Sequence, residues 1–546
     1  MPTLNWIGKS AVVKHHQDVP YRLLQPVPEL SCGPADGGNL IVQGDNLHAL
    51  KALLPRYAGQ VKCIYIDPPY NTGNEGWVYN DNVNSPEIRR WLGEVVGKEG
   101  ETLDRHDRWL CMMYPRLVLL RQFLRDDGVI FVSIDDHELA NLLYLMQEVF
   151  GPKNYVEVFS WIKTETPSNL SRKTKKKTEY VVCFQAGRFG GRFRGLQRSS
   201  NSDNPLLKKQ NSIKTLTFPA GTVITNMPGQ GTIDAGEYGT NVNKIRLENP
   251  SRYRDGYFID PVALTGRFIW TQDNLLEELR SGTEVRIKTR TMIPSYEKAS
   301  YEAEVPSNLI GADEGVQSNE SASSDIASLA LDFNYSKPES LVRYLVNMVC
   351  DTDSIVLDSF AGSGTTAHAL LKQNAEDGGK RRFILVEMDA GIARNVTAER
   401  IRRVTQGYRN AAGAEIAGLG GGFQFCRLSN EPLFAPDGQI RDEVTFAELA
   451  DFVWFSETGT GYRPGGKKSS KLGVHEGRGI YLLYNGILGD KSVDGGNVLT
   501  GMVLDLLPEH DGPRVIYAAA CRLGTPRLHR EGIVFRQTPY ALEVSP

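Results

Sequence analysis

Residues 61–70 of this 546-residue chain read VKCIYIDPPY, a buried-strand pattern with a polar ending. The first six positions are almost continuously apolar, as in strands that are covered on both faces of a parallel sheet. The strand stops at Asp67, Pro68, Pro69 and Tyr70, because proline cannot continue a central strand. Open α/β sheets bind ligands at the carboxyl ends of their strands, so Asp67 is a candidate functional residue. Two prolines also form an ordinary strand-ending turn, and the tetrapeptide alone does not separate these interpretations.

Strand and helix patterns alternate on both sides of this stretch. Asp45 and Asn46, for example, can cap a helix that follows a short apolar strand. Alternation of this kind indicates an α/β layer with parallel strands. The predicted elements are strands 39–44, 129–134, 355–357 and 383–386, and helices 47–57, 106–126, 136–150, 339–350 and 366–373.

Residues 358–366, DSFAGSGTT, make a second polar ending between a strand and a helix. Glycines here let the backbone approach a ligand that faces the helix amino terminus. The stretch lacks the third glycine of G-x-G-x-x-G and the lysine of a phosphate loop. Glu387 ends the next strand, 23 residues beyond Gly364, where dinucleotide folds place an acid that binds ribose hydroxyls. The pattern therefore predicts a nucleoside ligand without an essential pyrophosphate, and S-adenosylmethionine fits that description.

The two motifs in this order resemble the amino-group DNA methyltransferases of the β class, in which DPPY precedes the target-recognition insert and FxGxG follows it. The likeness is greatest to the modification (Mod) subunit of type III restriction–modification systems. It implies a Rossmann-like α/β methyltransferase core with circularly permuted motif order, an inserted target-recognition domain and a small C-terminal α/β domain. The matching stretches cover most of residues 37–405 and are NLIVQGDNLHALKALLPRYAGQVKCIYIDPPYNTGN, VIFVSIDDHE, KPESLVRYL, IVLDSFAGSGTTAHAL and GGKRRFILVEMD.

Breaks in the alternation give the expected domain boundaries. The pattern stops after Trp161 and returns near Pro338, and a glycine cluster at 418–422 precedes the tail. A polar stretch, 311–324, is expected to be a loop at the end of the insert. We expect the first part of the core at 1–160, the inserted DNA target-recognition domain at 161–330, the second part of the core at 331–415 and the C-terminal domain at 422–546.

The resemblance also implies where the cofactor binds. Lys337 and Pro338 would flank the methionine end of S-adenosylmethionine, and Glu387 would hold the ribose. Asp45 has two interpretations, a contact to the cofactor's adenine and a simple helix cap. The predicted cofactor-binding residues are Asp45, Lys337, Pro338, Asp358, Phe360, Ala361, Gly362, Ser363, Gly364, Thr365 and Glu387.

The DPPY residues suit transfer to an exocyclic amine. The lone pair of adenine N6 is delocalised into the ring, which makes it a poor nucleophile. If the Asp67 carboxylate and the Pro68 carbonyl accept both N6 hydrogens, the lone pair can point at the methyl group for in-line transfer that needs no metal. Tyr70 offers a face on which a flipped base can stack. The predicted catalytic residues are Asp67, Pro68, Pro69 and Tyr70.

Other interpretations of the same motifs remain. A cytosine-N4 methyltransferase would use the same scaffold, although its motif more often begins with Ser than with Asp. A catalytically silent DNA-specificity subunit and an RNA substrate are further alternatives. The run Asp135-Asp136-His137-Glu138 resembles a metal cluster, but its place between strand and helix favours capping.

Charge is distributed unevenly along the chain. The net charge is −3, yet residues 161–214 contain 13 basic and 3 acidic residues, which leaves −13 for the rest. Such a segment can bind phosphates without regard to sequence, whereas base contacts must supply specificity. The predicted DNA-binding residues are Arg172, Lys173, Lys175, Lys176 and Lys177.

The expected setting follows from the composition and from the resemblance. No secretion signal or membrane-spanning run is seen, and seven scattered cysteines without a CxxC pair fit reduced thiols, so we expect a cytoplasmic, nucleoid-associated protein. Double-stranded DNA is the expected partner. The resemblance adds a second copy of the chain and a separate ATP-dependent restriction subunit, while a methyltransferase without any nuclease partner remains open.

Overall fold

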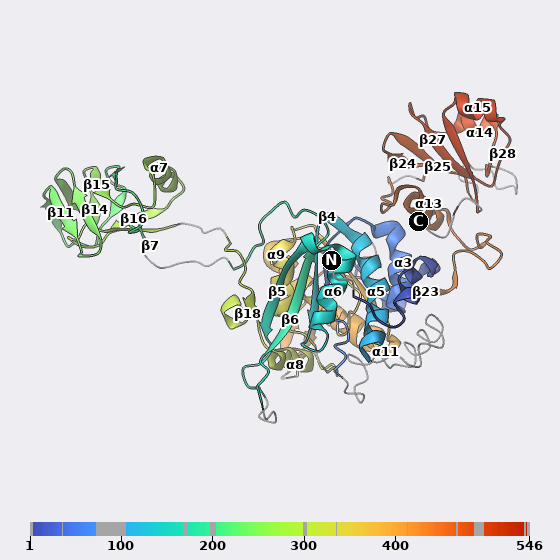
Figure 1. Cartoon of the computed structure of the whole chain (residues 1–546), viewed down its shortest axis with the longest axis horizontal. Coiled ribbons are helices and arrows are strands. Elements are labelled where there is room, and N and C mark those ends of the chain that lie inside the picture. Colours follow the sequence, from blue (N-terminus) through green and yellow to red (C-terminus); the bar gives the residue numbers. More distant parts are fainter. Residues whose placement is uncertain are drawn as a thin grey trace. The chain divides into compact units, whose positions relative to one another are not determined.

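The protein is described by a computed structural model in which two compact units can be distinguished (Figure 1). One unit joins residues 1–193 with 306–546, and the other is Arg194–Val305. Within the part of the chain that is described, no helix has the length and hydropathy needed to cross a membrane. The structure describes all residues except 1–3, 35–36, 73–104, 168–172, 197–203, 299–302, 335, 412, 466–467, 485–495, 540–541 and 543–546.

A ten-stranded sheet forms the centre of the first unit. Its strands run parallel from β23 to β4, while β1 and β6 are antiparallel to their neighbours. The order is β1 (Arg22–Pro26), β23 (Gln424–Pro432), β2 (Leu40–Gln43), β20 (Arg382–Glu387), β19 (Ile355–Asp358), β3 (Val61–Ile66), β4 (Leu124–Ile134), β6 (Thr178–Gln185), β5 (Tyr155–Ile162) and β18 (Leu309–Ile310).

Two strands from distant parts of the sequence meet in the middle of this sheet. β3 and β19 are parallel neighbours, with Cys63 opposite Val356 and Ile64 opposite Leu357. Both strands are buried along their whole length, as their apolar sequences predict. The chain continues from β3 to β4 on one side and from β19 to β20 on the other, so the order of the strands reverses between them. This switch point is where open α/β sheets bind ligands.

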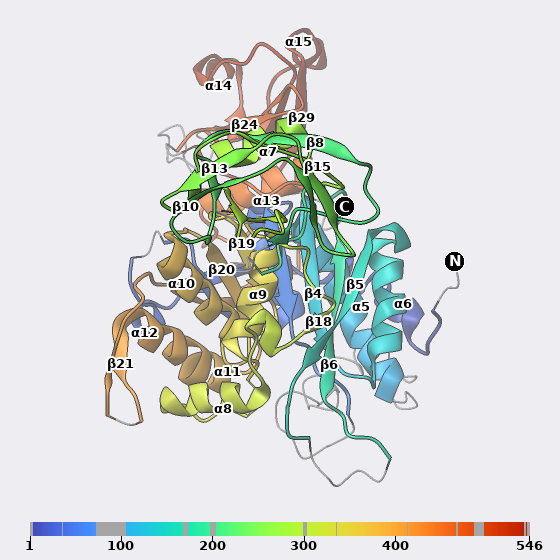
Figure 2. The same ribbon diagram turned by 90° about the vertical axis from the view of Figure 1, so that its left-hand side faces the viewer.

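Helices cover both faces of the sheet. α3 (Asn46–Tyr57), α5 (Arg105–Phe123) and α6 (Leu139–Phe150) pack along one face. α9 (Glu339–Val349), α10 (Thr365–Asp377) and α12 (Ala398–Gln406) pack along the other (Figure 2). The α/β class and its parallel core are therefore as predicted from the alternation of patterns.

The polar stretch at 311–324 is not simply a loop, and the prediction was wrong there. α8 (Asn319–Ser328) covers its second half. Ala322 and Ile326, four residues apart, are the buried positions of this helix. The serines that suggested a loop are accommodated because Ser323 and Ser328 donate hydrogen bonds to carbonyls of the preceding turn.

The Arg194–Val305 unit is built almost entirely from β-strands around its own apolar core. This unit is shorter than the predicted insert, because residues 161–193 and 306–330 group with the first unit. β6, which belongs to the first of these two segments, lies in the central sheet of the first unit. Among the described residues of this unit, one helix, α7 (Gln272–Arg280), accompanies two sheets. Their orders are β10 (Gln230–Ile233), β13 (Ser251–Arg254), β14 (Tyr257–Phe258), β9 (Val223–Ile224), β16 (Glu284–Ile287), β17 (Pro294–Glu297), β7 (Asn204–Pro205), and β11 (Gly236–Gly239), β12 (Lys244–Leu247), β15 (Val262–Gly266), β8 (Lys214–Phe218).

The tail carries a second small α/β layer. Thr445 and Glu448 form a capping box at the start of α13 (Phe446–Thr458), which packs on α3. The C-terminal domain was expected to start at residue 422. This boundary comes one strand too early, because β23, which follows it, pairs with β1 and β2 of the central sheet. The tail sheet has the order β24 (Lys471–His475), β25 (Arg478–Leu482), β27 (Arg514–Ala518), β29 (Ile533–Gln537).

Candidate active site

One pocket at the carboxyl ends of β3 and β19 is lined by both sequence motifs. Asp67 follows the first strand, and the glycine turn that contains Gly362 follows the second. Lys337, just before α9, contributes a third wall. The two motifs therefore share one site, as the parallel-sheet prediction requires. The lining residues are Tyr65, Asp67, Phe333, Ser336, Lys337, Asp358, Phe360, Ala361, Gly362, Ser363, Thr365 and Thr366.

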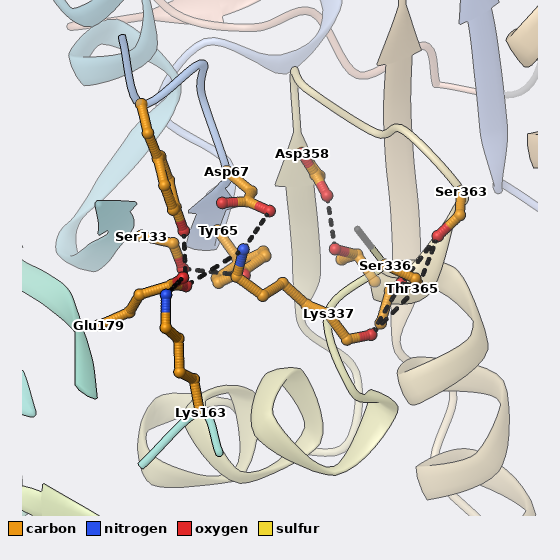
Figure 3. Close-up of polar contacts among 12 residues, drawn as sticks. Tyr65, Asp67, Ser133, Lys163, Glu179, Ser336, Lys337, Asp358, Ser363 and Thr365 are labelled. Atoms are coloured by element: carbon orange, nitrogen blue, oxygen red, sulfur yellow. Dashed lines mark hydrogen bonds and ion pairs between the residues drawn. The ribbon is translucent and has the colours of Figure 1, made fainter. Parts of the chain in front are cut away.

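The two carboxylate oxygens of Asp67 differ in their surroundings. Lys337 Nζ donates to Oδ2 at 2.9 Å (Figure 3). Oδ1 is buried and has no hydrogen-bond partner among the described residues. Burial raises the pKa of Asp67 above its usual range, against the opposing effect of Lys337. A buried acceptor without a donor is costly to the fold, so Asp67 is suited to receive a donor from a ligand.

Lys337 also reaches a second carboxylate, as Figure 3 shows. Its Nζ lies 3.6 Å from Glu179 Oε2, and Lys163 Nζ lies 2.8 Å from Glu179 Oε1. Burial opposes ionisation of Glu179, but Lys337 and Lys163 outweigh it and hold the pKa of that carboxyl below its usual range. Burial likewise disfavours the charge of Lys337, yet Asp67 and Glu179 raise its pKa. The two acids and two lysines form a neutral, tightly paired cluster.

Tyr70 joins this cluster through its hydroxyl. Tyr70 Oη donates to Glu179 Oε2 at 3.3 Å, and the Lys337 ammonium lies 4.8 Å from the centre of the ring. Pro68 is buried, and the Pro69 carbonyl accepts from the indole of Trp109 at 2.7 Å. Lys337 thus contacts both groups that were predicted to receive a base, the Asp67 carboxylate and the Tyr70 ring.

The glycine turn is fixed to the end of β20. Gly362 and Gly364 have φ angles of 49° and 80°, a region that glycine adopts easily. The Gly362 N–H donates to Glu387 Oε2 at 2.9 Å, and the Asp389 N–H donates to Oε1 at 2.8 Å. A β-carbon on Gly364 would lie 3.2 Å from Thr397 Cγ2, so α10 packs closely against the neighbouring helical segment. Glu387, the acid predicted to bind the ribose, is therefore hydrogen-bonded directly to the glycine turn that is predicted to bind the cofactor.

Two acids of the turn region are buried. Burial raises the pKa of Glu387 to about 8, although N–H donors from Asp389 and Gly362 oppose the rise. Burial also raises the pKa of Asp358 to about 7. Thr366 Oγ1 and the Phe360 N–H donate to Asp358 at 2.5 and 3.0 Å. Both carboxylate oxygens of Asp358 therefore accept hydrogen bonds from the turn and from the start of α10, which follows it.

Asp45 caps α3, which confirms that interpretation of the residue. Its Oδ1 accepts from the N–H groups of Leu47 and His48 at 3.0 and 3.2 Å. Its Oδ2 lies 3.3 Å from the buried guanidinium of Arg116. The residue follows β2, next to β20, at the same edge of the sheet as Glu387.

The acidic run after β4 is held by neighbouring side chains. Ligand atoms of Asp135, Asp136 and His137 lie within 4.8 Å of one another, a spacing that a metal ion could bridge. However, Asp135 accepts from the backbone and the ring of His137, at 2.9 and 2.6 Å, and Asp136 accepts from Lys176 at 2.7 Å. α6 begins only at Leu139, and its cap, Glu138, makes no side-chain capping bond. The cluster thus forms a local turn, and the prediction of a helix cap was wrong in this detail.

The predicted DNA-binding lysines lie on the first unit, next to the active-site strand β6. Lys176 pairs with Asp136 at 2.7 Å, and Lys177 lies 3.7 Å from Glu165. These pairs are about half exposed, where an ion pair contributes at most about 1 kcal/mol, so phosphates can compete for the lysines. Arg172 lies outside the described residues.

Several site residues were missed by the sequence analysis. Glu179 and Lys163 were counted only as members of the charged segment, and Ser336 and Arg400 were not considered. The signal for Glu179 was its position at the start of the apolar run Tyr180–Phe184, since a charge on a buried strand needs a partner. No local pattern marks Arg400, whose contacts are all made across the fold.

The sequence matches a known protein family. Residues 61–399, more than half of the chain, match the family model described as DNA methylase. The chain is 34% identical over 484 residues to the type III restriction-modification enzyme StyLTI Mod subunit of Salmonella typhimurium strain LT2, a match that covers 84% of this chain and 70% of that one. It is 30% identical over 449 residues to the EcoPI Mod subunit of Escherichia phage P1, with coverage of 75% and 66%. Among solved structures, PvuII DNA methyltransferase (cytosine-N4-specific) matches with 12% identity and a TM-score of 0.33, covering 67% of this chain and 86% of that one.

A pocket at the switch point of a parallel sheet, lined by the DPPY aspartate and a glycine turn, is typical of the Rossmann-like methyltransferase fold. The chain belongs to the DNA methylase family, together with the Mod subunits of type III restriction-modification enzymes.

Proposed function

We propose that this protein transfers a methyl group from S-adenosylmethionine to N6 of a flipped-out adenine in double-stranded DNA, as the modification component of a restriction–modification system. The observation that carries the proposal is the shared pocket, which is lined by both Asp67 and the turn at Gly362. The Mod names of the relatives support the system, and the aspartate of DPPY supports adenine over cytosine.

The residues present fit the proposed cofactor. Glu387 is a buried carboxylate at a strand end, suited to two ribose hydroxyls, and the turn from Phe360 to Thr365 brings backbone close to the pocket. Lys337 also lines the pocket and is followed in the chain by Pro338, so this segment would lie beside the methionine end. When bound, the cofactor supplies a methyl group on a positively charged sulfur.

The chain's own residues then act on the base. The amino group of the base would donate one hydrogen to Asp67 and one to the Pro68 carbonyl, which directs the nitrogen lone pair toward the methyl group. For the base to reach Asp67 and stack on Tyr70, Lys337 must shift. Glu179, already 3.6 Å from Lys337 Nζ, can accept the lysine without leaving its charge unpaired.

We also propose that the Arg194–Val305 unit reads the DNA sequence. A groove of about 660 Å³ on this unit is lined by Lys209, Lys244, Arg246 and Arg267 and by a single acid, Glu237. Such a charge balance favours a polyanionic partner. Tight DNA binding would keep the protein in the nucleoid. We further propose that two copies of the chain associate and, because the relatives are named as Mod subunits of an enzyme, that a separate restriction subunit completes the assembly.

The function is tested by sequencing the methylated bases in DNA from cells that express this chain alone. We expect N6-methyladenine at one short sequence motif and unmodified DNA in cells with the Asp67→Ala variant. N4-methylcytosine at a motif would reassign the base but keep the site. An absence of modified bases, together with no labelled-methyl transfer by the purified chain, would contradict an active methyltransferase.

Neutralising Lys175, Lys176 and Lys177 together should weaken binding to all DNA sequences alike. If each lysine contacts a phosphate, the slope of log affinity against log salt should fall by about 3. Fluorescence anisotropy over a salt series, with specific and scrambled duplexes, measures both quantities. The matched control neutralises Lys14, Lys153 and Lys380, three exposed lysines outside the basic segment. Equal slopes for the two triple variants would rule out a phosphate role.

A further inference from the structure

Glu138 is a fully buried acid that does not line the pocket. The residue is 0% exposed, although it ends the acidic run that follows β4. Its side chain makes no capping bond to α6, and it is not among the three residues of that run whose ligand atoms lie together. A buried carboxylate needs donors to offset the loss of water, so the groups around Glu138 indicate what the residue serves.

The groups that contact Glu138 come from three segments of the chain. Asn71 Nδ2 donates to Oε1, and His106 Nδ1 lies 2.7 Å from the same oxygen. Oε2 accepts from Asn141 Nδ2 at 2.7 Å. His106 lies in the first turn of α5 and Asn141 in the first turn of α6, whereas Asn71 follows DPPY in the sequence. Glu138 therefore ties the end of the DPPY turn to the start of two helices.

Asn71 is held in a backbone conformation that few residues adopt. Its φ is 58°, in the left-handed region, and the residue is 2% exposed. Asparagine enters this region more readily than most residues, but the conformation still needs support from its surroundings. The side-chain amide gives that support, because Nδ2 donates to the Arg105 carbonyl at 3.0 Å as well as to Glu138. The residue that ends the turn is thus fixed to α5 and to Glu138.

The rest of the turn is tied to α5, except for two acceptors. The Pro69 carbonyl accepts from the indole of Trp109, which is also on α5, at 2.7 Å. Among the described residues, no donor contacts the Pro68 carbonyl or Asp67 Oδ1. The proposed mechanism assigns the amino group of the base to the Pro68 carbonyl and the Asp67 carboxylate. The contacts on Pro69 and Asn71 therefore hold the turn and leave these two acceptors open.

We propose that Glu138 is a positioning residue for methyl transfer, which acts through Asn71 to keep the Asp67 carboxylate and the Pro68 carbonyl at the separation that one amino group requires. The inference rests on the proposed function, because that amino group is its target. Misplacement of a reacting group by about 1 Å can cost about 100-fold in rate. A tether of this kind therefore affects the chemical step more than it affects binding.

Loss of either end of the tether should slow the chemical step alone. Asn71→Gly keeps the left-handed conformation accessible but removes the amide, and Glu138→Ala removes the acceptor. We expect each variant to lower the single-turnover rate of tritiated-methyl transfer about 10- to 100-fold, with affinities for S-adenosylhomocysteine and for a duplex with the methylated motif within about 3-fold of wild type. A wild-type rate in either variant, or affinities that fall as far as the rate, would overturn the inference.

Glu138→Gln is the conservative variant. Asn71 and His106 both contact Oε1, so a glutamine carbonyl can accept from both while its amide turns toward Asn141. We expect this variant to recover most of the rate that Glu138→Ala loses. Asn141→Ala is the matched control, because it removes the partner of Oε2 and leaves the turn in place. A loss in Asn141→Ala as large as in Glu138→Ala would show a purely structural role and overturn the inference.

A double-mutant cycle tests whether Glu138 acts through Asn71. If it does, adding Glu138→Ala to Asn71→Gly should slow transfer by less than about 3-fold further. A double variant that shows the product of the two single losses would overturn the inference.

A second pair of variants replaces Glu138→Ala if that variant does not fold. Asn71→Asp brings two carboxylates together, and adding Glu138→Gln should then raise its rate at least about 3-fold. No increase would overturn the inference. If the wild-type chain itself transferred no methyl group, the proposed function would fail, and the inference with it, whereas wild-type rates in the variants would remove the inference alone.

Discussion

Asp67→Ala is expected to abolish methyl transfer, with a loss of about 10³-fold or more in the single-turnover rate. The reason is that the two neighbouring carboxylates are already engaged. Asp358, which also lines the pocket, accepts from Phe360 and Thr366, and Glu179 is held by Tyr70, Lys163 and Lys337. Binding of S-adenosylhomocysteine and of DNA should remain close to wild type. Rapid-quench transfer of a tritiated methyl group, with both ligands saturating, measures the chemical step.

The matched control for this variant is Asp127→Asn. Asp127 also pairs with a buried lysine, Lys62, at 2.7 Å. Lys62 lies at the opposite end of β3, about 16 Å from Asp67 at roughly 3.3 Å per residue, so the control removes a similar ion pair away from the site. We expect it to retain full transfer activity. Wild-type rates for Asp67→Ala, or an equal loss in the control, would remove Asp67 from the mechanism.

Glu387→Ala should weaken binding of S-adenosylhomocysteine by about 100-fold, or roughly 3 kcal/mol. The substitution removes the acceptor for two ribose hydroxyls and also leaves the Gly362 N–H without its partner. Isothermal titration reports the loss directly. Glu399→Ala is the control, because Glu399 pairs with Arg402 and Arg403 away from the pocket. Unchanged affinity in Glu387→Ala would contradict the ribose assignment.

The same residue predicts a dependence on pH. Burial raises the pKa of Glu387 to about 8, so in the ligand-free chain this carboxyl is largely neutral at pH 7. Ribose hydroxyls that donate to the ionised form would lower this pKa, and binding would then release a proton. Affinity should therefore rise with pH up to about 8 and level off above it. Glu387→Gln, which cannot titrate, should remove this rise, whereas a rise that persisted in the variant would point to another group such as Asp358.

Much of the fold could be predicted because the relevant signals are local. The strand over Val61–Ile66 is found at the predicted residues, since continuous apolar runs that end in proline or glycine turns are explicit in the sequence. The same locality revealed Asp67, Gly362 and Glu387, each of which ends or follows a buried strand. Asp67 and Gly362 line one pocket and Glu387 is hydrogen-bonded to Gly362, as expected from the rule that parallel strands end at a common edge.

The contacts that were missed join residues far apart in the sequence. Glu179 meets Tyr70 across 109 positions, and Lys337 meets Asp67 across 270. Arg400 lies on an amphipathic helix whose pattern gives no reason to expect a buried arginine. Conversely, Phe184, which lies within the basic segment 161–214, is fully buried in the core, because β6 pairs with β4 in the central sheet. Periodicity describes the elements, whereas charge pairing depends on which strands become neighbours.

The most direct test is a crystal structure of the chain with S-adenosylhomocysteine. The ligand should lie between the glycine turn and Asp67, with its sulfur directed at the carboxylate. An amino group hydrogen-bonded to Asp67 would then lie about 3–3.5 Å from the transferred methyl group. A ligand bound in another pocket, or one whose sulfur points away from Asp67, would contradict a single site shared by the two motifs.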